Sequence, residues 1–149
     1  MKKWMTLMAL LAVTVQAGVV GGPQGGKLLD NLAPRAEFFV NAERKVEVRF
    51  YDAELKVVPP GEQVVNVIAE APSGKARLTL QWAGEALTSA EALPEGDGYL
   101  IVVQIKVSPA EKPQNFRITY HAELCGECQR AEYACICEHA GDGEHGHAH

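Results

Sequence analysis

Residues 99–107 read YLIVVQIKV, the longest apolar run beyond the first 17 residues. Most of its side chains are β-branched or aromatic, which is typical of β-strands. An apolar run without polar alternation indicates a strand covered on both faces. Pro109 and Pro113 follow and end it. The run therefore predicts a central strand of a β-sheet.

Three further segments, 45–51, 76–82 and 114–122, alternate apolar and polar residues with the two-residue period of a half-buried strand. The residues expected to face the core are Val46, Val48 and Phe50, then Leu78, Leu80 and Trp82, then Phe116, Ile118 and Tyr120. On the first strand, Tyr51 falls on the polar face. Residues 37–40 and 64–69 are shorter apolar segments, and residues 84–98 are compatible with a short strand or a helical turn.

Turn-forming segments at 41–44, 52–62 and 72–74 separate these strands, and no amphipathic helix stands out. Short strands spaced by turns are typical of antiparallel architectures. The sequence predicts an all-β chain, an antiparallel immunoglobulin-like β-sandwich over residues 35–124 that ends in a Cys/His-rich C-terminal tail.

The first 17 residues have the pattern of a Sec-type signal peptide. Lys2 and Lys3 precede an apolar stretch from Trp4 to Val15, and Ala17 ends a small-residue cleavage site. The apolar stretch is shorter than the roughly 20 residues that span a bilayer. We expect cleavage after Ala17, a periplasmic or secreted protein, and no membrane insertion after cleavage; an uncleaved anchor is the alternative.

Residues 18–34 form a Gly/Pro-rich leader without strand or helix periodicity. Within it, residues 21–27 match the G-x-x-x-x-G-K spacing of a phosphate-binding loop. Leu28 occupies the position of the magnesium-binding Ser or Thr, and no buried strand precedes the motif. We reject nucleotide binding and expect the leader to dock along a sheet edge.

The chain carries 14 basic and 19 acidic residues, and the signal peptide removes two lysines and no acid. A negatively charged mature protein is poorly suited to nucleic acid, whereas its carboxylates favour the approach of cations. Metal ions are therefore expected partners, and nucleic acid is not.

All cysteines and histidines of the chain lie in residues 121–149. The cysteines form two pairs, Cys125-x-x-Cys128 and Cys135-x-Cys137. A tight turn at Gly126 can bring the first two sulfurs together, and residues two apart in an extended chain point to the same side. Four thiolates can then surround a zinc or copper ion tetrahedrally. His139 could replace one of them, or His121 could enter from the edge of the sheet.

Two alternatives use the same cysteines. Exported proteins meet oxidising conditions, so the four could form disulfides, with the nested pairing of Cys125 with Cys137 and Cys128 with Cys135 favoured. The other alternative is a thiol-disulfide oxidoreductase built on Cys125 and Cys128. That chemistry needs the first cysteine at a helix N-terminus in a βαβ framework, which this pattern does not predict.

The C-terminal residues 139–149 combine glycine, acidic residues and histidine, and lack apolar residues that could fold alone. On such a flexible tail, the imidazoles of His139, His145, His147 and His149 can capture zinc, copper or nickel weakly. An inert solubilising tail or a cloning remnant would have the same composition. Because every histidine follows the strands, no hydrolase triad on a rigid framework is expected, and we predict that the protein is not an enzyme.

The segment Gly22-Pro23-Gln24-Gly25-Gly26-Lys27-Leu28-Leu29, followed by the strand pair at 38–40 and 46–50, resembles the N-terminal periplasmic domain of CzcB-like heavy-metal efflux adaptors. Those domains are small β-sandwiches that open with a similar glycine-rich motif, often with His in place of Gln24. The resemblance covers about residues 21–122. It implies a stand-alone relative in metal handling, with the metal contacts shifted to the C-terminal cysteines and histidines.

Together these features predict an exported transition-metal-binding protein that buffers or hands over zinc or copper, linked to a metal-efflux complex. The expected organisation is a signal peptide (1–17), a leader (18–34), a β-sandwich (35–124), a cysteine motif (125–138) and a flexible His-rich tail (139–149).

Overall fold

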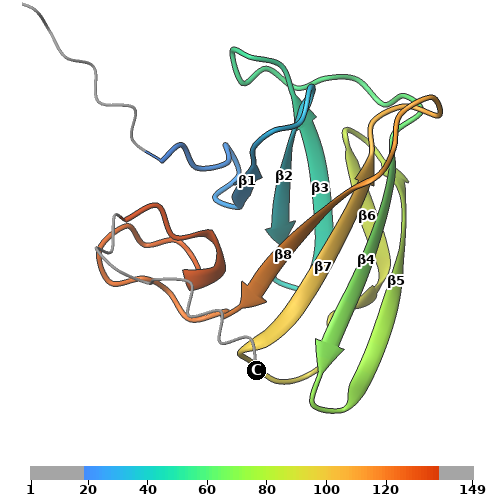
Figure 1. The fold of residues 1–149 in the computed structure, drawn as a ribbon. Coiled ribbons are helices and arrows are strands. Elements are labelled where there is room, and N and C mark those ends of the chain that lie inside the picture. The colour runs from blue at the N-terminus through green and yellow to red at the C-terminus, as the bar shows by residue number, and fades with distance from the viewer. Residues whose placement is uncertain (1–18, 138–149) are drawn as a thin grey trace, which may run out of the picture.

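The computed structural model describes residues 19–137, so residues 1–18, which include the expected signal peptide, and residues 138–149 lie outside the described part. The described chain forms eight strands and one short 3-10 helix (Figure 1). Their bounds are β1 (Lys27–Leu29), β2 (Arg35–Val40), β3 (Lys45–Tyr51), β4 (Val64–Ala71), β5 (Gly74–Ala83), β6 (Ala86–Ala92), β7 (Tyr99–Lys106), β8 (Gln114–Tyr120) and η1 (Glu132–Ala134).

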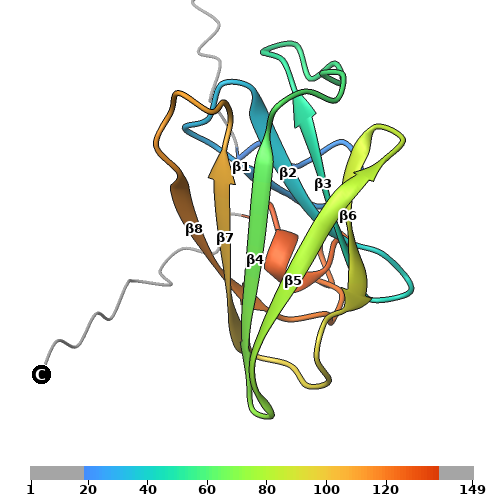
Figure 2. The same ribbon diagram turned by 90° about the vertical axis from the view of Figure 1, so that its right-hand side faces the viewer.

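All strands belong to one antiparallel sheet, in the order β1-β2-β3-β6-β5-β4-β7-β8. The sheet curls strongly, so that it is nearly barrel-shaped (Figure 2). β5 makes this possible: its first half pairs with β4, from Gly74 to Thr79, and its second half pairs with β6, from Leu80 to Ala83. The prediction of an all-β antiparallel chain is confirmed. An immunoglobulin-like sandwich of two separate sheets is not confirmed, because β5 joins both halves into one sheet.

Residues 84–98, whose sequence is compatible with a short strand or a helical turn, contain the strand β6, which joins β3 to β5. The apolar run 99–107 forms β7, with β4 on one side and β8 on the other. β7 is thus an interior strand, but it lies next to the edge strand β8 rather than in the middle of the sheet.

The core lies on the concave side of the curled sheet and follows the alternation read from the sequence. Val46, Val48 and Phe50 are buried on β3, and Ile101, Val103 and Ile105 on β7. The remaining predicted core residues also face the interior: Leu78, Ile118 and Tyr120 are buried, and Leu80, Trp82 and Phe116 are half-buried against the same core.

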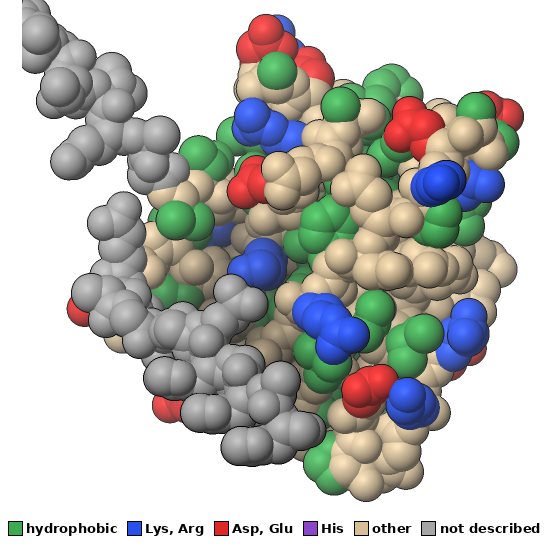
Figure 3. All heavy atoms as spheres, viewed as in Figure 1, with side chains coloured by type: hydrophobic (Ala, Val, Ile, Leu, Met, Phe, Trp, Pro, Cys, Tyr) green, Lys and Arg blue, Asp and Glu red, His purple; other side chains and the backbone are tan. Residues whose placement is uncertain are grey.

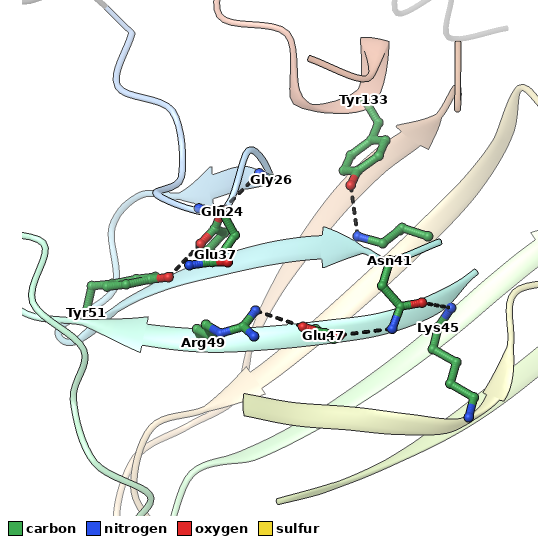
Figure 4. A network of polar contacts seen from close by, with 10 residues as sticks. Gln24, Gly26, Glu37, Asn41, Lys45, Glu47, Arg49, Tyr51 and Tyr133 are labelled. Atoms are coloured by element: carbon green, nitrogen blue, oxygen red, sulfur yellow. Dashed lines mark hydrogen bonds and ion pairs between the residues drawn. The ribbon is translucent and has the colours of Figure 1, made fainter. Parts of the chain in front are cut away.

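The leader contributes β1, an edge strand that pairs with β2 from Lys27↔Phe38 to Leu29↔Ala36. This agrees with the expected docking of the leader along a sheet edge. The preceding residues also cover the outer face of β2, where the carboxylate of Glu37 is buried. Tyr51, expected on the solvent side, is buried as well, because its hydroxyl donates a hydrogen bond to Glu37 Oε2 (2.7 Å) beneath this cover (Figure 4).

β1 and β8 are the two ends of the sheet order, so the curled sheet has an open seam between them. The segment after β8 turns back to this seam, and η1 contacts both edge strands (Figure 1). Residues 19–137 include no helix of the length and apolarity needed to cross a membrane.

Candidate metal centre

The first cysteine pair lies in a tight hairpin-like loop after β8. An antiparallel bridge between Leu124 and Ala131 closes the loop. Inside it, the Cys125 N–H donates to the Arg130 carbonyl (2.7 Å), and the Gln129 N–H donates to the Cys125 carbonyl (3.0 Å). Gln129 has a positive φ of 59°, the left-handed conformation that reverses the chain. This turn places Cys125 and Cys128 on the same side of the loop.

The 3-10 helix η1 brings the second cysteine pair back to the first. Its turns are held by hydrogen bonds from the Ala134 N–H to the Ala131 carbonyl (2.8 Å) and from the Cys135 N–H to the Glu132 carbonyl (3.2 Å). The backbone is extended at Cys135, where φ is −60° and ψ is 135°. Cys135 and Cys137 therefore follow the helix as an extended C-x-C step that faces the loop of Cys125 and Cys128.

The four sulfur atoms form one compact group, all within 4.8 Å of one another, and none of the thiols is in a disulfide. The Sγ–Sγ distances are 3.4 Å between Cys125 and Cys135, 3.7 Å between Cys125 and Cys137, and 3.8 Å between Cys128 and Cys135. Zinc–sulfur bonds of about 2.3 Å in a tetrahedron separate neighbouring sulfurs by about 3.8 Å. The four cysteines lie close enough together to hold one metal ion.

Backbone N–H groups point at the sulfurs and favour thiolates. Hydrogen bonds from the backbone of Ile136 and Arg130 lower the pKa of Cys128 to about 6. The Cys137 N–H donates to Cys135 Sγ at 3.4 Å. Burial, together with hydrogen bonds to Cys125 and Cys135, raises the pKa of the Cys137 thiol. Without a cation, four adjacent sulfurs cannot all ionise, whereas a bound metal ion would favour the thiolate form of each.

Arg130 attaches the cysteine loop to the leader. Its Nη1 donates to the carbonyls of Gly22 (3.1 Å) and Gly26 (3.3 Å). The guanidinium lies so close to Gly21 that a Cβ there would be 2.6 Å from it. The leader loop is held in turn by Glu37 Oε1, which accepts hydrogen bonds from the backbone N–H groups of Gln24 (2.9 Å) and Gly26 (2.8 Å) (Figure 4).

Tyr133 of η1 attaches the same segment to the core. Its ring packs edge-on against Phe38, with centroids 5.8 Å apart, and lies tilted by 36° against the ring of Tyr120, with centroids 5.6 Å apart. Its hydroxyl accepts a hydrogen bond from the Val40 N–H at the end of β2 (2.9 Å) (Figure 4). The cysteine segment is thus fixed to β2 through Tyr133 and to the leader through Arg130.

None of the predicted histidine ligands joins the four cysteines within the described residues. His121 is exposed and pairs with Asp97, Nδ1 to Oδ2 at 2.7 Å. It is not part of the four-cysteine group, which is the one cluster of three or more potential metal ligands within residues 19–137. The other four, His139, His145, His147 and His149, lie outside the described residues.

The sequence did not identify the Arg130 and Tyr133 side chains as the groups that attach the cysteine segment to the leader and to β2, or Glu37 as the residue that holds the leader loop. Arg130 and Tyr133 act across long sequence separations, 104 residues from Arg130 to Gly26 and 93 from Tyr133 to Val40, whereas Glu37 acts over 11 and 13 residues on Gly26 and Gln24. The glycine-rich motif at residues 22–26 was the sequence feature that could have indicated this close packing of the leader. A Cβ at Gly22 would overlap the Glu37 side chain, and a Cβ at Gly26 would overlap the Phe38 carbonyl oxygen. The glycines of the motif therefore let the backbone pass close over a buried carboxylate.

Comparison of the chain with protein-family models, with curated proteins and with solved structures finds no match.

Proposed function

We propose that this chain is an exported transition-metal-binding protein, with one zinc or copper ion bound by Cys125, Cys128, Cys135 and Cys137. The observation that supports it most directly is the convergence of four sulfurs within 4.8 Å, from two segments that fold back on each other. Four thiolates in a tetrahedral arrangement suit zinc, and thiolates also suit monovalent copper.

The proposed role is to buffer the ion or to hand it over, rather than to catalyse a reaction. A site in which protein thiolates take all four positions has no open position for substrate. Because each thiol must lose its proton to bind, affinity is expected to fall as the pH falls. The histidines of the tail, His139, His145, His147 and His149, would form a weaker capture arm.

The export and efflux parts of the proposal rest on sequence. The first 17 residues have the features of a signal peptide, which supports a periplasmic or secreted location. The motif at 22–29 supports kinship with the small β-sandwich domains of CzcB-like adaptors, and hence a link to a metal-efflux complex. In the structure this motif is the loop over Glu37 together with β1, next to the cysteine loop.

Native mass spectrometry of the reduced mature protein, loaded with zinc or monovalent copper and then desalted, tests metal binding. We expect one retained ion in the wild type. The matched variants are the double substitution Cys125→Ser with Cys128→Ser, which should lose the ion, and alanine at the four tail histidines, which should keep it. No retained ion in the wild type, or equal retention in the cysteine variant, would contradict the proposal.

Disulfide staples are the second candidate, and one observation favours them. The Sγ atoms of the nested pairs, Cys125 with Cys137 and Cys128 with Cys135, are 3.7 and 3.8 Å apart, so either pair could form a bond after a small shift. The same mass measurement on unreduced protein separates the two candidates. Disulfides appear as the loss of four hydrogens without a bound ion, whereas the metal site appears as intact thiols with a retained ion.

A further inference from the structure

We propose that metal binding at the four cysteines closes the seam between β1 and β8, with Arg130 and Tyr133 as the positioning residues that couple the site to the sheet. This inference rests on the proposed metal site. It adds that the ion controls the exposure of two edge strands and of the core between them.

The seam is where the cysteine segment sits. Within residues 19–137 no strand pairing joins β1 to β8, and η1 contacts both of them instead. A groove of about 280 Å³ lies at this place, and its lining includes Leu29 of β1, Phe116 of β8, and Cys135 and Ile136 of the cysteine segment. The space-filling view shows the surface hollowed here, with basic side chains in the hollow (Figure 3). One wall of the groove is therefore the segment that carries the metal ligands.

Arg130 is the first connection. It comes two residues after Cys128, and its backbone hydrogen-bonds the Cys128 sulfur while its guanidinium bonds the carbonyls of Gly22 and Gly26. Any change in the loop at Cys128 is thereby passed to the leader that precedes β1. The N–H groups of Gln24 and Gly26 donate to Glu37, so hydrogen exchange at these two amides reports whether the leader is docked.

Tyr133 is the second connection. It comes two residues before Cys135, and its ring is buried against Phe38 and Tyr120, which belong to strands on opposite sides of the seam. The Val40 N–H donates to its hydroxyl, so this amide reports whether η1 is in place. Without Tyr133, the rings of Phe38 and Tyr120 would lose their cover.

Apart from the contacts of Arg130 and Tyr133 and the hydrogen bonds within its own loop, little holds the segment in place without an ion. Residues 121–137 contain one isolated bridge and a three-residue helix, and only Cys125, Tyr133 and Ala134 among them are buried. Ordering such a segment costs conformational entropy for every residue, which this small apolar burial offsets only in part. Metal–thiolate bonds contribute directly to the folding of small loops of this kind. Loss of the ion should therefore release the segment while the sheet remains folded.

Hydrogen exchange of the mature protein, zinc-loaded against metal-free under reducing conditions, tests this coupling. We expect exchange about tenfold faster or more in the metal-free protein at the amides of Gln24, Gly26 and Val40. These amides donate to Glu37 and Tyr133, and they lose those hydrogen bonds when the leader and η1 are released. The ladder between β4 and β5, in the middle of the sheet order, is the internal control and should not change. Faster exchange confined to residues 123–137 would overturn the inference.

Two variants test the connections separately. Arg130→Gln should still bind one zinc ion, but loading should no longer protect Gln24 and Gly26. Tyr133→Phe keeps the ring and should lose protection at Val40 alone. Lys75→Gln removes a cation from an exposed pair with Glu70 (2.9 Å) and serves as the matched control, with no change at any reporter.

The outcomes separate this inference from the function it rests on. Absence of a retained ion in the native mass spectrum contradicts the metal site itself. A retained ion without protection at the three reporter amides overturns only the coupling to the seam. Loss of the ion in Arg130→Gln would also overturn the coupling as stated, because Arg130 would then belong to the binding of the metal.

Discussion

Glu37 shows how one buried side chain can organise a loop, here the residues that lie 11 and 13 positions before it. It is a carboxylate on a strand, buried to 1% exposure, which is costly unless its oxygens are fully hydrogen-bonded. Here Oε1 accepts from Gln24 and Gly26 and Oε2 accepts from the Tyr51 hydroxyl. The carboxylate therefore holds the leader loop, and through Gly26 it also supports the contact with Arg130.

Replacing Glu37 by leucine should lower the free energy of unfolding by about 2–4 kcal/mol, because three donors lose their acceptor and two of them are backbone groups. Urea denaturation followed by fluorescence or circular dichroism measures the change. Glu37→Gln is the matched control and should lose less, since its amide oxygen can still accept from Gln24 and Gly26. A leucine variant within about 0.5 kcal/mol of the wild type would contradict this role.

Among the elements, β1 and the loop before it depend on close backbone approach. Gly26 precedes β1, and a Cβ there would lie 2.4 Å from the Phe38 carbonyl oxygen, a distance that no side chain can tolerate. Gly25 has a φ of 91°, which favours glycine. The loop thus explains why three residues of the glycine-rich motif, Gly22, Gly25 and Gly26, need to be glycine in this fold.

Gly26→Ala should lower the free energy of unfolding by about 1–3 kcal/mol, because the added methyl group forces β1 away from β2. The matched control is Gly126→Ala in the cysteine loop, where a Cβ meets nothing within 4 Å and φ is not positive. Thermal unfolding of both variants provides the comparison. Equal melting temperatures for the two would show that β1 is not held as closely as described.

Across the molecule as a whole, the aromatic side chains tie the curled sheet together. The tilted rings of Tyr99 and Tyr120 pack with centroids 5.3 Å apart, and Tyr133 extends this group from the cysteine segment. Burial raises the pKa of every tyrosine in the chain: Tyr51, Tyr99, Tyr120 and Tyr133, the last to about 12. Tyr51 is raised further by the carboxylate of Glu37.

A spectroscopic titration should therefore detect little tyrosinate in the native protein at pH 10, where an unfolded chain would be about half ionised. Because the folded-state pKa values are raised, the stability they contribute is fully present below about pH 10 and is lost as the pH rises further. We expect tyrosinate absorbance to appear together with alkaline unfolding measured by circular dichroism. Titration of several tyrosines in a chain that remains folded would contradict this.

Much of the strand content was predictable from periodicity. Val46, Val48 and Phe50, and likewise the apolar residues of β7, face the core because a strand alternates its side chains wherever it is placed. The position of β7 beside an edge strand was not predictable, and neither were the two partners of β5. Strand order depends on which distant segments pair, and the local pattern of a strand carries little information about its neighbours.

The candidate site divides in the same way. The spacings C-x-x-C and C-x-C predicted that each cysteine pair would bring two sulfurs together locally. The two pairs meet because the loop after β8 and the 3-10 helix η1 fold the second pair back on the first. The attachment of the cysteine segment to the sheet could not be predicted, because it depends on long-range hydrogen bonds of Arg130 with Gly22 and of Tyr133 with Val40.

The sequence by itself determined the all-β class, the core-facing residues and the four candidate thiolate ligands, because these follow from short-range periodicity and spacing. Only the tertiary structure decided that the strands form one curled sheet and that the cysteine segment fills the seam between β1 and β8. The physical reason is that both depend on contacts between residues distant in the chain, such as Arg130 with Gly26 and Tyr133 with Val40, and these partners come together only once the chain has folded.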